Sequence, residues 1–411
     1  MKALAVLLWL TLASPGTDVS GRWTGTFSVA GSDHKEPQLF ILKQEGKQLT
    51  GSGGPDAVEQ YPITSGRVED DVVRFELTTT NWTFTYNLKR VDQELSGDLL
   101  LENKNGDTRT ARVTLRSVTG AAGAGTVDVK PQSAVPAIVR TFDRFPIVAI
   151  GERHSIREVG DFYVSLVKDP NFQAQVNCIV IEFGSRLSQP IVDRYIDGEE
   201  VALSELQHVW RDTTKAFAFE SPVYAQLLKA VREVNLGSPP ARHIRVLAGD
   251  SPIDWTKVAT HEQWASYQPN DLSFAEVISE EVLARNRKAL VILGGSHVSK
   301  NRDPNRDPNT TTLVERKHPG SMYVVLLTQS TRAAESKGKV PLLRPTPEGA
   351  DVGDFGDALL YLGKTLTTAD PDWRPYRTDP VYVKELDRRA RIEWGCGFHL
   401  NRFRNGQLPC P

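Results

Sequence analysis

Residues 146–154 read PIVAIGERH, an apolar run that ends in a glycine and then in charged and imidazole side chains. Three later apolar runs are also followed by acidic or imidazole side chains, two of them after glycine: Cys178 to Ile181 before Glu182, Ile244 to Ala248 before Gly249 and Asp250, and Ala289 to Leu293 before Gly294, Gly295, Ser296 and His297. Runs built almost wholly of Val, Ile, Leu and Ala are typical of strands whose two faces are both covered.

Longer amphipathic stretches separate these runs, and two more apolar runs follow at Tyr323 to Thr328 and Ala358 to Leu362. The helix candidates are Val159 to Lys168, Gln189 to Tyr195, Pro222 to Val234 and Phe274 to Arg287. Strands that alternate with helices predict a mostly parallel sheet with helices on both faces. We expect this α/β domain to span residues 138–411.

The chain before this domain has a different pattern. From about Val19 to Val118, short apolar-polar alternations are broken by turn-forming residues, without a helical stretch. Roughly eight short strands with no covering helix must bury one face against each other. We therefore predict a small all-β barrel or sandwich over residues 19–118, similar in pattern to lipocalins, and a Gly- and Ala-rich linker over 119–137.

The N-terminal sequence and the charge composition indicate where the protein is located and which partners it binds. Lys2, the apolar run from Ala3 to Leu12 and the small residues after it resemble a secretory signal peptide over residues 1–18. This predicts a secreted or periplasmic protein, and no stretch is long enough for a stable membrane span. Lys and Arg number 49 against 51 Asp and Glu, interspersed throughout, so we expect no nucleic-acid partner.

The chain has three cysteines. Cys178 lies in an apolar run and is expected to be a small buried side chain. Cys396 and Cys410 lie near the C-terminus, where they could form a disulfide in an oxidising compartment or remain two free thiols.

The carboxyl ends of parallel strands meet at one edge of a sheet, which is where ligands bind in such folds. We therefore expect Glu152, His154, Glu182, Asp250 and His297 to form one site. A carboxylate that ends a wholly apolar run, as Glu182 does, needs a cation, a metal or a hydrogen-bond donor beside it. The turn of Gly294, Gly295 and Ser296 is expected to let the backbone approach a ligand.

Two further clusters combine an aromatic ring with charge, which is how small ligands are oriented in pockets. Trp210 and Arg211 form the first, and Asp254 and Trp255 the second. We predict that they bind substrate. Arg211 could clamp a carboxylate or phosphate, or it could form an Arg–Asp surface pair near a helix start.

The Gly151-Glu152-x-His154 motif, the strand ending in Glu182 and the Gly294-Gly295-Ser296-His297 motif resemble a signature shared by three groups. These are ChaN-like haem-binding lipoproteins, erythromycin esterases and TraB/Tiki metalloproteases. The likeness to the esterases implies that His154 is a general base partnered by Glu152 or Glu182. The likeness to the Tiki group implies that His154, Glu182 and His297 could hold a divalent metal. The spacing is closest to ChaN-like proteins, which implies haem as a further ligand.

These observations predict an exported hydrolase that acts on an ester, amide or related bond of a small molecule or peptide. Two alternatives from other classes stay open. The same crevice could bind haem or a metal without catalysis, or the N-terminal barrel could be the main ligand-binding module.

Overall fold

A computed structural model describes the chain in two compact units, each with its own core. The described residues are 18–29, 36–54, 60–79, 82–104, 106–117, 131–300, 307–328, 341–345, 355–363 and 365–401. Residues 1–17 of the expected signal peptide, 118–130 around the expected linker, and Cys410 of the expected disulfide lie outside them. Cys178 is a free, buried thiol, as its sequence context predicts.

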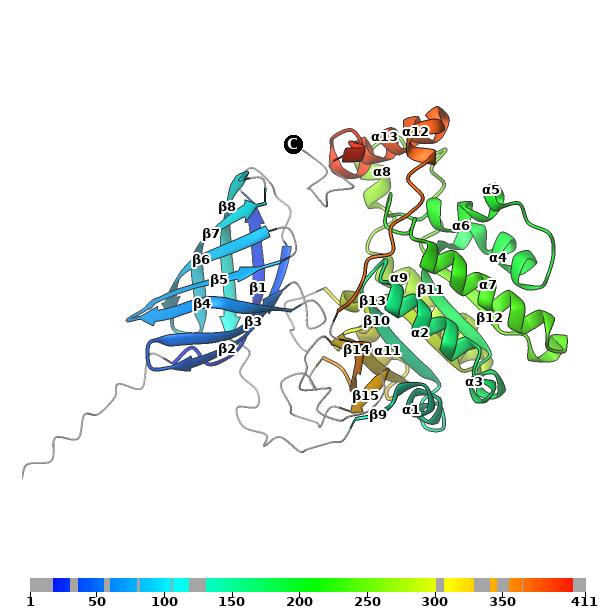
Figure 1. The fold of residues 1–411 in the computed structure, drawn as a ribbon, viewed down its shortest axis with the longest axis horizontal. Coiled ribbons are helices and arrows are strands. Elements are labelled where there is room, and N and C mark those ends of the chain that lie inside the picture. Colours follow the sequence, from blue (N-terminus) through cyan, green and yellow to red (C-terminus); the bar gives the residue numbers. More distant parts are fainter. Residues whose placement is uncertain are drawn as a thin grey trace, which may run out of the picture. The chain divides into compact units, whose positions relative to one another are not determined.

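The N-terminal unit is a closed barrel in which each strand pairs antiparallel with the next and β8 returns to β1 (Figure 1). The prediction of a small all-β domain is confirmed. The strands are β1 (Gly21–Val29), β2 (Glu36–Glu45), β3 (Gln48–Gly54), β4 (Tyr61–Glu69), β5 (Val72–Thr78), β6 (Trp82–Val91), β7 (Glu94–Asn103) and β8 (Thr108–Ser117).

Side chains alternate between the barrel interior and its surface, as period-two strands require. In β5, Val73, Phe75 and Leu77 are buried and the residues between them are more exposed. The Phe75 ring stacks on Tyr86 at 4.5 Å, and the Tyr86 hydroxyl donates to Gln38 Oε1 at 2.9 Å. The interior therefore holds one apolar cluster with a paired hydroxyl. A ligand role for the barrel stays a prediction.

The second unit is built on an eight-stranded sheet with the order β12-β11-β13-β10-β14-β16-β15-β9. The six strands predicted from the sequence run parallel: β10 (Ile147–Glu152), β11 (Cys178–Ser185), β12 (Arg245–Asp250), β13 (Ala289–Gly294), β14 (Met322–Thr328) and β16 (Ala358–Tyr361). Every residue of β10, β11 and β13 is buried, so both faces of the central sheet are covered. The mostly parallel α/β sheet is confirmed.

Two short strands extend one edge of the sheet antiparallel, and the sequence did not predict them. They are β15 (Leu342–Pro345) and β9 (Gln132–Ser133). Strands of four and two residues are too short to show a period of their own.

Three of the predicted helices begin and end within a few residues of the expected positions, at α2 (Arg157–Val167), α4 (Gln189–Ile196) and α7 (Pro222–Leu236). The remaining helices are α1 (Ala134–Thr141), α3 (Pro170–Gln175), α5 (Leu203–Leu206), α6 (His208–Arg211), α8 (His261–Ala265), α9 (Asn270–Val277), α10 (Gly295–Val298), α11 (Thr310–Lys317), α12 (Pro375–Thr378) and α13 (Pro380–Trp394). Within the described ranges, no helix is both long and apolar enough to cross a membrane.

The fourth predicted helix, over residues 274–287, differs in the structure. Helix α9 begins four residues earlier, at Asn270, and ends at Val277. A π-turn over Ile278–Val282 and a 3₁₀ turn over Leu283–Arg285 follow it. Asn286 then ends the segment in the left-handed conformation, which Asn tolerates better than most residues.

Candidate functional site

Two histidines at the carboxyl edge of the sheet are each held by a carboxylate. Glu152 ends β10, and its Oε1 lies 2.8 Å from His154 Nδ1. His297 lies in α10, directly after β13, and its Nδ1 lies 2.9 Å from Oδ1 of Asp271 in the first turn of α9. An acceptor at Nδ1 fixes the tautomer and leaves Nε2 for chemistry.

Glu182 of β11 lies between the two rings. Its Oε1 is 3.7 Å from His154 Nε2 and 3.6 Å from His297 Nε2. These separations are too long for hydrogen bonds but short enough for a strong charge interaction with either imidazolium. Strands β10 and β11 both pair with β13, which brings the three chain segments together. Four of the five predicted site residues, Glu152, His154, Glu182 and His297, therefore lie in one cluster.

The need for a partner at Glu182 is met by the backbone of Gly294. The Glu182 side chain is only 6% exposed, and its Oε2 accepts the Gly294 N–H. A Cβ at Gly294 would lie 3.3 Å from both Glu182 Oε2 and His154 Nε2, so a larger residue would crowd both groups. Gly295 and Ser296 are the first two residues of α10.

Burial and charge act against each other at the acids and bases. Burial raises the pKa of Glu152, against the opposing effect of its hydrogen bond and charge interaction with His154. Burial alone would lower the pKa of His297, but the charges of Glu182 and Asp271 outweigh it and raise that pKa. His297 therefore stays protonated to a higher pH than a free imidazole would.

Aromatic side chains line the two histidines. Phe219 packs edge-to-face with His154, and Phe274 packs edge-to-face with His297, each with ring centres 5.2 Å apart. The Tyr224 hydroxyl lies 3.4 Å from Glu152 Oε1 and accepts the Ser155 N–H at 3.1 Å.

The His154 side chain is 38% exposed, whereas Glu152 and Glu182 are buried. Solvent or a ligand can thus reach His154 more easily than the acids behind it.

Asp250, the fifth predicted site residue, contacts other groups. It is 1% exposed and accepts hydrogen bonds from Thr214 N, Thr214 Oγ1 and Asn270 Nδ2 at 2.6, 2.9 and 2.7 Å. Asn270 directly precedes Asp271, which contacts His297. Asp250 is therefore linked to His297 only indirectly, through the first residues of α9. Burial raises the pKa of Asp250 to about 7.

The predicted substrate-binding clusters are engaged in contacts of their own. Arg211 pairs with Glu220 at 2.8 Å and lies over the Tyr382 ring. The alternative to a ligand clamp was an Arg–Asp surface pair, whereas Arg211 pairs with a Glu and its side chain is only 17% exposed. Trp210 belongs to the main core of the α/β unit. Trp255 is buried and donates to Thr213 O, while Asp254 pairs with Lys257.

Sequence reasoning missed Asp271. The helix was predicted to begin at Phe274, which left Asp271 in a loop. The Pro269-Asn270-Asp271 stretch carried a usable signal, because Asn and Asp are common at the first positions of helices. Tyr224 lies inside the predicted helix of residues 222–234, where nothing in the sequence marks it as polar-facing.

The three side chains that could hold a metal, His154, Glu182 and His297, do lie together. In the described part of the chain, however, no group of three or more His, Cys, Asp or Glu side chains is arranged to hold a metal ion. A metal role of these residues stays a prediction.

The sequence matches no protein-family model and no curated protein. Several solved structures are similar to it. The haem-binding protein ChaN of Campylobacter jejuni is 13% identical over 55% of this chain and 90% of that chain, with a TM-score of 0.33. The erythromycin esterase EreC, a mutant in its open conformation, is 10% identical over 57% and 94%, with a TM-score of 0.43. Zebrafish ileal bile acid-binding protein, complexed with cholic acid, is 13% identical over 24% and 98%, with a TM-score of 0.16.

Proposed function

We propose that this protein is a hydrolase that cleaves an ester, amide or related bond of a small molecule or peptide. One observation carries the proposal: each of two imidazoles is held at Nδ1 by a carboxylate, and both turn Nε2 toward the same oxygen of Glu182. Two ring nitrogens that face one another across a buried charge suit a base and an acid in one reaction.

His154 has the features of the base. Its Nδ1–H donates to Glu152, so Nε2 is the ring nitrogen that takes a proton from water. As that proton leaves, the water oxygen bonds to the substrate carbonyl carbon. The exposure of the His154 side chain gives water and substrate access to this nitrogen.

His297 has the features of the acid. The charges of Asp271 and Glu182 stabilise its protonated form. Its Nε2 proton passes to the leaving oxygen or nitrogen as the bond to the carbonyl carbon breaks. Water thus supplies the new hydroxyl, His154 gains one proton and His297 loses one. Exchange with solvent restores both rings, and Glu182 stabilises whichever ring is charged.

The alternative of a haem site has weaker support from these contacts. An axial histidine needs a ring nitrogen that faces the iron. Here both Nε2 atoms face Glu182, less than 4 Å away. Acid–base chemistry uses this arrangement directly, so we favour hydrolysis. We also propose export to a secreted or periplasmic location, on the strength of the N-terminal sequence.

The decisive experiment is a screen of generic ester and peptide substrates with wild type and Glu182→Gln. We expect kcat/KM to fall by roughly 100-fold or more in the variant, in line with the loss of acid–base catalysis. Glu233→Gln is the matched control, because it makes the same change on α7, where the exposed side chain of Glu233 pairs with Lys168. Equal turnover by wild type and Glu182→Gln would contradict the proposal. A strong Soret band on haem addition that is lost in His154→Ala would favour the haem alternative instead.

A further inference from the structure

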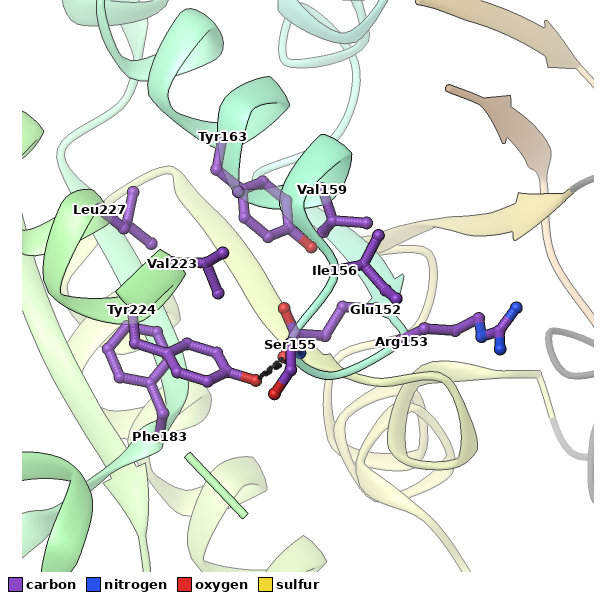
Figure 2. A pocket seen from close by; sticks show the side chains of 11 residues that line it. Glu152, Arg153, Ser155, Ile156, Val159, Tyr163, Phe183, Val223, Tyr224 and Leu227 are labelled. Atoms are coloured by element: carbon purple, nitrogen blue, oxygen red, sulfur yellow. Dashed lines mark hydrogen bonds between the residues drawn. The ribbon is translucent and has the colours of Figure 1, made fainter. Parts of the chain in front are cut away.

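A small cavity lies beside Glu152, between α2 and α7 (Figure 2). Its walls are largely apolar, and three of its lining residues bring polar groups from separate segments: Glu152, Tyr163 and Tyr224. The cavity leaves about 10 Å³ for the centre of a water molecule. Roughly 10 to 15 Å³ of such space is enough to hold one water, provided that polar partners are present.

Tyr163 supplies an unsatisfied donor. Its side chain is 3% exposed, and its hydroxyl has no hydrogen-bond partner among the described residues. The hydroxyl points toward the Glu152 carboxyl (Figure 2). Burial, reinforced by the charges of Glu152 and Glu182, raises the pKa of Tyr163 well above its usual range. The hydroxyl therefore keeps its proton, and a buried O–H without an acceptor is costly.

Glu152 supplies a matching acceptor. Its Oε1 takes the hydrogen bonds from His154 Nδ1 and the Tyr224 hydroxyl. No hydrogen bond to its Oε2 occurs within the part of the chain that the structure describes. An ionised carboxylate accepts on both oxygens, so this oxygen of the buried Glu152 side chain can take a further donor.

We propose that the cavity is a binding site for one water molecule, which accepts from Tyr163 Oη and donates to Glu152 Oε2. Tyr163 is then a positioning residue that acts through this water on the Glu152–His154 pair. With a donor on each oxygen, the Glu152 carboxylate is held in one orientation and keeps the His154 Nδ1 proton in place. The meaning for catalysis rests on the proposed hydrolysis, whereas the water and its effect on this hydrogen bond do not.

Crystal structures of wild type and Tyr163→Phe, at a resolution that shows ordered waters, test the site directly. We expect a water within hydrogen-bonding distance of Tyr163 Oη and Glu152 Oε2 in wild type. The variant should keep the fold and lose the water, because one polar partner is gone. A wild-type cavity without water, or the same water in the variant, would overturn the proposal.

The positioning role is tested by NMR on protein with ¹⁵N-labelled histidine. The Nδ1–H resonance of His154 is assigned by its loss in His154→Gln. In Tyr163→Phe we expect it to move downfield, because Glu152 loses a donor and becomes a stronger acceptor. Tyr323→Phe is the control, since it removes a hydroxyl that lies near Asp357 O. Thermal unfolding checks that both variants fold.

An unmoved His154 resonance in Tyr163→Phe, or an equal shift in Tyr323→Phe, would overturn the positioning role. These readouts need no substrate. Failure of the proposed hydrolysis would appear as absent turnover in the substrate screen, with the water and the downfield shift still present. Failure of the water site would leave the turnover of wild type untouched.

Discussion

Asp271 and Glu152 both hold an imidazole at Nδ1, but their surroundings differ. Oδ1 of Asp271 also accepts Thr310 N at 2.7 Å and Thr310 Oγ1 at 2.6 Å. Together with His297 Nδ1, three donor groups thus surround this oxygen. The charge of Glu182 and that of Asp271 raise the pKa of His297, so this ring keeps its proton to a higher pH than a free imidazole would.

Asp271→Asn should therefore separate charge from geometry. The Asn oxygen can accept from the same three donors, while the negative charge is lost. Without that charge the pKa of His297 falls, so the alkaline limb of the kcat/KM profile should move to lower pH by about one unit. An imidazole titration by NMR checks the same shift without a substrate. An alkaline limb that stays in place would show that Asp271 does not keep His297 protonated.

Most residues of the histidine–carboxylate cluster could be predicted from their positions in the sequence, because each of them ends or follows a predicted strand. Glu152, His154, Glu182 and His297 come after apolar runs, and parallel strands bring such positions to one edge. Asp271 could not be found in that way, since a helix rather than a strand end carries it. The hydrogen bonds of Asp250 were equally hidden, because Thr214 and Asn270 lie in segments that show no strand pattern.

At the scale of elements, β12 and α9 are joined by one buried carboxyl. Asp250 ends β12 and accepts from Asn270, the first residue of α9. The next residue is Asp271, so this bond fixes the helix start that orients His297. The break after α9 escaped sequence reasoning because a π-turn keeps the apolar residues in nearly helical spacing.

Asp250→Asn should change how stability depends on pH. Burial raises the pKa of Asp250 from 3.8 to about 7. The folded state thus binds this proton more tightly than the unfolded state, so ionisation lowers the free energy of unfolding as pH rises from about 4 to about 7. The variant lacks this proton, and its free energy of unfolding should fall less over that window.

Urea unfolding of wild type and Asp250→Asn at about pH 5 and about pH 7 measures the difference. Asp254→Asn is the control, because the pKa of Asp254 is lowered to about 2 by Lys257 and Thr256 and it stays ionised throughout. At about pH 5 we expect Asp250→Asn to be less stable than wild type by about 1 to 3 kcal/mol, since one amide oxygen replaces two acceptors. At about pH 7 the difference should be smaller, because only wild type loses stability through ionisation of Asp250. Parallel pH slopes for Asp250→Asn and wild type would contradict the raised pKa.

At the scale of the whole molecule, each of the two units has a main hydrophobic core of its own. One is the barrel interior around Trp23, Phe75 and Tyr86, and the other surrounds the central strands of the α/β sheet. The change from period-two alternation to alternating strands and helices was readable in the sequence, because the two patterns bury apolar side chains at different spacings. The sequence did not decide between a closed barrel and a sandwich, since both need the same alternation of buried and exposed residues.

Because each unit has a complete core, we expect two unfolding transitions in calorimetry of the full chain. Phe75→Ala removes a ring from the barrel interior, where Phe75 is 2% exposed, and should destabilise the barrel by about 3 to 5 kcal/mol. Leu228→Ala makes a matched cavity in the α/β core, where Leu228 of α7 is fully buried. Each variant should lower the temperature of one transition and leave the other in place. A single transition lowered by both variants would show that the two cores unfold as one cooperative unit.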